Sequence, residues 1–145
     1  GEHNGTFRGN NHAFVTAAAA LERYWSDDAL TDSVDDKAGL VRERLAAIAR
    51  PHAAEVRGRG LIAGIAFEDT EIASLASRAA FEQGLIVETA GPSDEVLKVL
   101  PALTIPRLEL ERGLDIMSRA VGTAFDRASK AKSNGSTAMA PAVRS

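Results

Sequence analysis

The sequence has 145 residues, a formal net charge of −3 and no cysteine, with 45% hydrophobic and 26% charged residues. This length suffices for one modest domain with a core, and the slightly acidic balance argues against nucleic acid as a partner, because phosphates attract basic surfaces. The lack of cysteine excludes disulfides and thiolate metal ligands, and no apolar run reaches the roughly 20 residues that span a bilayer, so we expect a cytoplasmic protein without a membrane partner.

The chain opens with a loop rich in glycine and asparagine, GEHNGTFRGNN, and an alanine-rich run follows it. Apolar residues at helical spacing from Phe14 to Trp25 predict a helix that begins near Asn11, is capped by Asn10 or Asn11, and packs through one face. Amides of a glycine-rich turn ahead of a helix favour a phosphate or carboxylate ligand, and Thr6 adds a hydroxyl donor. The spacing is not that of a P-loop, so an ordinary capping turn is the alternative.

A second helix is predicted after the break at 26–28, where an aspartate can cap it, and Pro51 ends it. Its apolar residues form one stripe, which consists of Leu30, Val34, Ala38, Val41, Leu45 and Ile48. The stretch EVRGRGLIAGIAFED then predicts two short strands, or one strand with a glycine bulge.

A third helix is predicted over DTEIASLASRAAFEQG, with Asp69 or Thr70 as its cap and Gly84 as its end. Two strand-like segments follow, LIVET and VLKVLPALTIP, and the turn GPSDE separates them. A last helix is predicted from Arg107 to about Phe125. The whole pattern predicts an α/β layer in which helices pack on a small sheet of three or four strands.

The spacing of the charged and chelating residues does not by itself identify an anion site or a metal site. The two arginines of RGRG are too few for an anion patch and favour a tight turn, and His3, His12 and His52 lack the spacing of metal ligands, so no metal is expected. Lys98 lies within the apolar strand VLKVLPAL. It either faces inward beside an anionic partner or, by strand alternation, faces outward as an ordinary surface lysine.

Four stretches, taken in order, resemble the class III aminotransferases, which use pyridoxal phosphate (PLP). HNGTFRGNN resembles that family's His-Gly-Ser-Thr-Phe-Gly-Gly-Asn-Pro loop, and VRGRGLIAGI resembles its Val-Arg-Gly-Lys-Gly-Leu strand pair. GLIVET resembles the strand that follows the next helix, and LKVLPALTI the family's Ile-Arg-Phe-Ala-Pro-Pro-Leu strand. Arg8 replaces the loop's glycine and Asn11 its proline, as in the subgroup that makes diaminobutyrate.

The resemblance implies a site shared between the subunits of a homodimer. It implies that the Thr6 hydroxyl binds the PLP phosphate across the dimer interface and that Gly5 and Phe7 shape this loop. It also implies that Lys98 replaces an arginine that clamps a substrate carboxylate in many relatives. A lysine offers a point charge instead of a planar fork, so the grip on the substrate is expected to differ.

The activity that the resemblance implies is transamination. The amino group of L-glutamate moves to L-aspartate 4-semialdehyde and gives L-2,4-diaminobutyrate and 2-oxoglutarate, the first step of ectoine biosynthesis. One alternative is a class III enzyme that acts on ornithine, acetylornithine or 4-aminobutyrate. Another is a non-catalytic α/β domain that binds a small anion or a partner protein.

The resemblance further implies that this chain is the C-terminal portion of a fold-type I enzyme. Residues 1–26 are then a phosphate-contacting loop and a helix from the large PLP domain, residues 27–126 the small C-terminal domain, and residues 127–145 a disordered tail. The Schiff-base lysine is expected before Gly1, so no catalytic residue and no turnover are expected from 1–145 alone. None of the chain's lysines lies in a matching context; they are Lys37, Lys98, Lys130 and Lys132.

Overall fold

The computed structural model describes residues 5–137. Its helices are α1 (Asn11–Tyr24), α2 (Ala29–Ala49), α3 (Glu71–Glu82) and α4 (Arg107–Thr137), with a short 3-10 turn, η1 (Arg50–His52). Its strands are β1 (Glu55–Arg59), β2 (Ile62–Ala66), β3 (Thr89–Ala90) and β4 (Val96–Val99). All neighbouring strands are antiparallel, in the order β1-β2-β4-β3. Within these residues, no helix combines the length and the apolar character needed to cross a bilayer.

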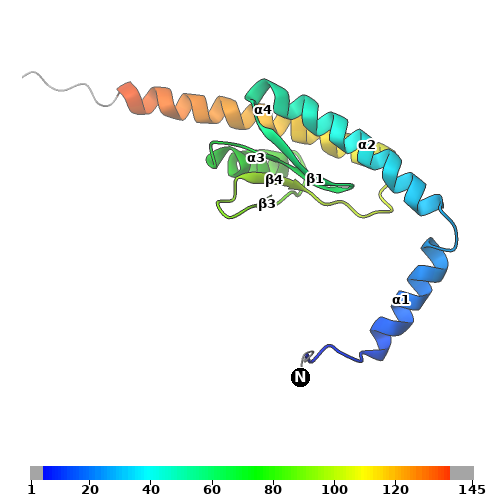
Figure 1. The fold of residues 1–145 in the computed structure, drawn as a ribbon. Helices are drawn as coiled ribbons and strands as arrows, with labels where there is room; N and C mark the ends of the chain where they lie inside the picture. The colour runs from blue at the N-terminus through cyan, green and yellow to red at the C-terminus, as the bar shows by residue number, and fades with distance from the viewer. Residues whose placement is uncertain (1–4, 138–145) are drawn as a thin grey trace, which may run out of the picture.

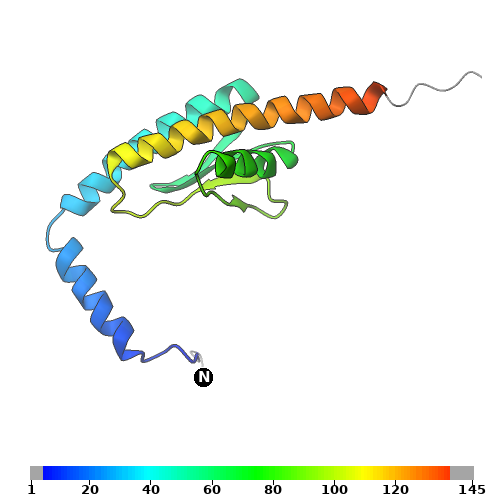
Figure 2. The same ribbon diagram turned by 180° about the vertical axis from the view of Figure 1, so that it is seen from behind.

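The helices α2, α3 and α4 lie together on one side of the sheet, as Figures 1 and 2 show from opposite directions. The predicted arrangement of helices on a small sheet is therefore confirmed, with a sheet of four strands. The core lies between these two layers. Its largest fully buried side chains come from both layers and are Val41, Leu45, Ile65, Ile72, Leu97, Met117 and Val121.

The predicted stripe of α2 is the part of the sequence that forms this core most directly. Val41 and Leu45 are fully buried, and Ala38 and Ile48 are nearly so. These positions recur every three or four residues, so they lie on one face of the helix. The helix ends where η1 begins, at the turn that contains Pro51, as the sequence predicts.

The stretch around RGRG forms a hairpin, which confirms the prediction of two strands with a tight turn. Gly58 has φ +113° and Gly60 has φ +61°, a backbone conformation that residues with a Cβ rarely adopt. At Gly58 a Cβ would also collide with the carbonyl oxygen of Ile62. The two glycines therefore let β1 turn back directly into β2.

Helix α1 begins at the predicted residue but does not pack as predicted. Figure 1 shows it extending away from the sheet and the other helices, and none of its residues is buried. Its predicted apolar face is exposed, with Phe14, Leu21 and Trp25 at half or more of their full accessibility. The bend at 26–28 separates it from α2, so the two helices do not share a core.

Two other predictions about the second half need correction. The segment LIVET forms ladder pairs only from Thr89, because groups of Leu85 and Val87 bond to α3 instead. The amide of Leu85 donates to the carbonyl of Ala80, and the carbonyl of Val87 accepts from the Ser77 hydroxyl at 2.8 Å.

The last helix continues past the predicted end at Phe125 and reaches Thr137. The prediction of disorder is therefore wrong for 127–137, while 138–145 lie outside the described residues. Small side chains allow this extension, since Ala124 and Ala128 join the core. Two ion pairs also tie it to the α3 region, Arg127 to Glu82 at 2.7 Å and Lys132 to Asp69 at 3.0 Å.

We expect Ile65→Ala to lower the free energy of unfolding by about 2–5 kcal/mol, because Ile65 on β2 is fully buried in the core. Ile62→Ala removes the same atoms from the same strand at a position that is 63% exposed. This substitution should change the free energy of unfolding by less than about 0.5 kcal/mol. Urea denaturation followed by circular dichroism measures both. Equal losses would contradict the core described here.

Candidate cofactor and substrate site

The described part of the opening loop is a turn that leaves the amides of residues 5–7 unused. The amide of Arg8 donates to the carbonyl of Gly5 at 3.2 Å, which closes the turn. Within the described residues, the amides of Gly5, Thr6 and Phe7 and the Thr6 hydroxyl have no hydrogen-bond partner. Thr6 is exposed, and Phe7 is 88% exposed. These donors are therefore available to an anion.

The first turn of α1, by contrast, is already satisfied. The Asn10 side-chain oxygen accepts from the amides of His12 at 3.0 Å and Ala13 at 3.3 Å. Of the two predicted caps, Asn10 is thus the one that the chain uses. Because this asparagine occupies the amides at the start of the helix, an anion bound here contacts the loop before it.

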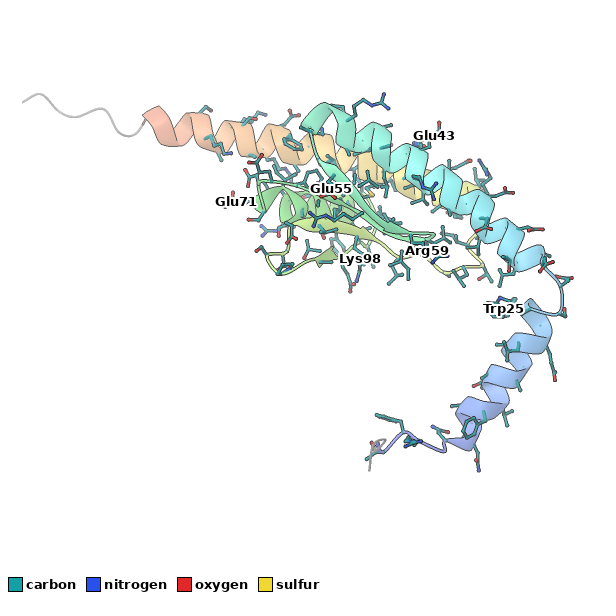
Figure 3. All side chains as sticks on the ribbon, in the orientation of Figure 1. Trp25, Glu43, Glu55, Arg59, Glu71 and Lys98 are labelled. Carbon is teal, nitrogen blue, oxygen red and sulfur yellow. The ribbon has the colours of Figure 1, made fainter. Side chains whose placement is uncertain are left out.

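Lys98 lies on β4 and faces away from the core. Its neighbours Leu97 and Val99 are buried against the helices, and alternation places Lys98 on the opposite face. Figure 3 shows its side chain on the side of the sheet away from α2 and α4. The outward alternative is therefore the observed one, although Lys98 also has an anionic partner.

That partner is Glu88, the residue just before β3. The Lys98 ammonium lies 2.7 Å from Glu88 Oε2, and the Lys98 amide donates to the Glu88 carbonyl at 2.9 Å. The hydrogen bond from the ammonium, reinforced by its charge, holds the pKa of Glu88 below its ordinary value. Lys98 is 29% exposed and Glu88 is 72% exposed, so the pair borders solvent.

Arg57 on β1, a basic residue of the same sheet, forms a structural ion pair. The Arg57 guanidinium lies 2.8 Å from Glu55 Oε2 and 3.6 Å from Glu95 Oε1. Arg57 thus links the edge strand β1 to the turn before β4. This agrees with the prediction that RGRG is not an anion patch.

The remaining lysines do not form a reactive centre in the described part of the chain. Lys37 is only 5% exposed, and its ammonium donates to the carbonyls of Leu103 at 2.6 Å and Ile105 at 3.3 Å. It therefore fixes the connection between β4 and α4. Lys132 pairs with Asp69, and Lys130 lies on the surface of α4.

No cluster of three potential metal ligands occurs among the residues that the structure describes. His12 and His52 lie on different elements, α1 and η1, and His52 stacks on the Phe125 ring at 3.8 Å. His3, the third histidine of the chain, lies outside the described residues.

The predicted site residues do not converge within this chain. The loop that contains Thr6 lies at the far end of α1, away from the strands that carry Lys98 (Figure 1). Sequence reasoning also missed Glu88 as the partner of Lys98. The available signal was the acid that ends the apolar run LIV, because a strand placed beside VLKV brings that acid next to the lysine.

The sequence places the chain in a family of known fold. A sequence profile of the family described as aminotransferase class-III matches residues 1–121. The chain therefore belongs to the class III aminotransferases.

Its curated relatives include several proteins with one name. The chain is 54% identical over 124 residues to the diaminobutyrate–2-oxoglutarate transaminase of Nocardia farcinica, covering 85% of this chain and 28% of that protein. It is 53% identical over 129 residues to the protein of the same name from Bordetella parapertussis, with 86% and 30% covered. The chain thus spans less than a third of the length of these relatives.

Solved structures agree on the fold. The N-acetylornithine aminotransferase of Stenotrophomonas maltophilia matches with a TM-score of 0.67 and 30% identity, over 83% of this chain and 33% of that one. A Bacillus anthracis aminotransferase matches with a TM-score of 0.71 and 23% identity, over 84% and 30% of the two chains. The predicted fold class is confirmed by these matches.

We expect the pKa of the Glu88 carboxyl to lie below its ordinary value, because Lys98 stabilises the ionised form. In Lys98→Met this pKa should return to its ordinary value. Since folding lowers this pKa, the pair stabilises the fold above the unfolded pKa of about 4.3, and this contribution is lost as the pH falls through the folded value. Carboxyl NMR measures the pKa. Glu82, whose pKa Arg127 lowers, is the control and should keep its shift in Lys98→Met; an unchanged Glu88 would contradict the pairing.

Proposed function

We propose that the whole protein is a PLP-dependent transaminase that moves the amino group of L-glutamate to L-aspartate 4-semialdehyde, giving L-2,4-diaminobutyrate and 2-oxoglutarate. The observation that carries the proposal is the identity of about half of all aligned residues with proteins named diaminobutyrate–2-oxoglutarate transaminase. We place the reaction in the cytoplasm, at the start of ectoine synthesis. The lack of cysteine in the chain agrees with a reducing compartment.

The opening loop fits the phosphate group of PLP. It offers the Thr6 hydroxyl and the amides of Gly5, Thr6 and Phe7, and no described residue competes for these donors. Short charge-assisted hydrogen bonds from such donors suit a phosphate oxygen. Bound PLP would supply the electron sink for the reaction and carry the amino group between its two halves.

The separation of this loop from the sheet supports a site completed by a second subunit. The loop lies at the end of an exposed helix and is distant from the proposed substrate residue of its own chain. A loop in this position can reach a ligand that a second subunit holds. We therefore propose a homodimer in which Thr6 contacts the PLP phosphate of the partner's site. The residues that exchange protons with the substrate are proposed to lie outside 1–145.

Lys98 is the proposed substrate contact in this chain. Its ammonium faces the open side of the sheet, where a carboxylate can approach it. An ammonium carries three donors, and within the described residues only Glu88 occupies one of them. Lys98 can thus bind a substrate carboxylate while it keeps its pair.

We expect the full-length enzyme to use the glutamate and aspartate semialdehyde pair at least about tenfold more efficiently than ornithine, acetylornithine or 4-aminobutyrate, a difference that one well-placed polar contact can supply. A panel of amino donors and acceptors, assayed by kcat/KM, measures this. The acetylornithine alternative has its support in the solved structure at 30% identity. A preference for acetylornithine would transfer the assignment to that branch of the family.

Thr6→Ala is expected to weaken PLP binding by roughly 10- to 100-fold, because a hydrogen bond to a charged group is lost, whereas Thr6→Ser should retain most of it. Titration of the apoenzyme with PLP, followed by absorbance, measures the affinity. Thr16→Ala is a matched control, since the Thr16 hydroxyl bonds only to carbonyls of α1. Equal affinities of Thr6→Ala and Thr16→Ala would contradict the phosphate contact.

A further inference from the structure

Lys37 is the one charged side chain that is buried among the residues described by the structure. It lies in α2 and is only 5% exposed. Within these residues its ammonium bonds to two backbone carbonyls and to no carboxylate. Burial of a charge without a counter-charge costs free energy, and an apolar residue would avoid this cost. The two hydrogen bonds are therefore what the ammonium contributes at this position.

Both carbonyls belong to residues 100–105, the segment that joins β4 to α4. The ammonium donates to Leu103 at 2.6 Å and to Ile105 at 3.3 Å. The segment contains no helix or strand, and its one internal backbone hydrogen bond runs from the Ile105 amide to the Ala102 carbonyl at 3.0 Å. In the described part of the chain, Lys37 thus provides the hydrogen bonds that tie this segment to another element.

This segment directly continues the strand that carries Lys98. β4 has four residues, and its last ladder pair, Val99 with Ala63, follows the pair of Lys98 with Gly64. The end of a short strand opens more readily than its centre, because fewer contacts hold it. A tether on the residues after Val99 limits this opening. It therefore restricts the backbone position of Lys98.

We propose that Lys37 is a positioning residue for substrate binding, because its ammonium holds the segment after β4 and thereby keeps Lys98 where a substrate carboxylate can reach it. The inference rests on the proposed function, in which Lys98 is the substrate contact, and it adds a buried residue from another element. Lys37 acts through the backbone and does not touch the substrate, since α2 packs on the face of the sheet opposite to Lys98.

The test begins with Lys37→Met in the full-length enzyme, because methionine suits a buried position and carries no donor. We expect KM for L-glutamate to rise about fivefold, which is part of the roughly tenfold loss that removal of one charged hydrogen bond produces. The value of kcat should stay within about twofold, as for a change in substrate binding alone. The affinity for PLP should also stay within about twofold, because the turn beside Thr6 closes locally.

A double-mutant cycle with Lys98→Met separates positioning from a general structural role. If Lys37 acts through Lys98, Lys37→Met should change KM for glutamate by less than about twofold once Lys98 has been replaced. Independent effects would instead multiply in the double variant. Steady-state kinetics of the two single variants, the double variant and the unaltered enzyme provide the four values that the cycle needs.

Three further variants serve as controls. Arg44→Met removes another cation of α2, which pairs with Asp115 of α4 at the surface, and should leave KM unchanged. Lys37→Arg keeps a charged donor and should restore part of the affinity for glutamate. Circular dichroism checks the folding of each variant. If Lys37→Met does not fold, Lys37→Gln, which keeps an uncharged donor, replaces it in the cycle.

An unchanged KM for glutamate in Lys37→Met, or losses that multiply in the double variant, would overturn the inference and leave the transaminase assignment intact. An unchanged KM in Lys98→Met would overturn the substrate contact and this inference with it. Failure of the unaltered enzyme to use L-aspartate 4-semialdehyde would overturn the proposed function alone, because the cycle can still be measured with glutamate and another amino acceptor.

Discussion

The alternation of side chains along β4 is the constraint on which the rest of the site depends. Because Leu97 and Val99 are buried against the helices, Lys98 has to face the other side of the sheet. The pairing of β4 with β2 and β3 then decides its surroundings, with Gly64 opposite it and Glu88 beside it. A shift of the register by one residue would bury the lysine and expose two core residues.

The two parts of the proposed site are held by different physical means. The loop around Thr6 is local, since its turn closes between Gly5 and Arg8 and Asn10 caps the following helix. The Lys98–Glu88 pair depends on the whole two-layer core, because strands from different parts of the chain must align to form it. Damage to the core is thus expected to affect the substrate contact more than the phosphate contact.

The sequence was most informative where one pattern decided the structure. The stripe of α2, the glycines of the β1–β2 turn and the loop before Asn11 follow from periodicity, backbone freedom and capping. The incorrect predictions concern segments whose structure depends on tertiary contacts. Ser77 draws the Val87 carbonyl away from the ladder, and Glu82 and Asp69 hold a helical extension whose own residues are small and polar. The partner of Lys98 required the strand register, which no single segment contains.

The charges on β1 have an effect on assembly that is separate from the proposed chemistry. As the outer strand, β1 has a row of backbone groups free to pair with another chain, which is a common route to aggregation. Its five residues include Glu55, Arg57 and Arg59, all exposed. A foreign strand would have to place its side chains beside these charges, so they disfavour growth of the sheet from this edge.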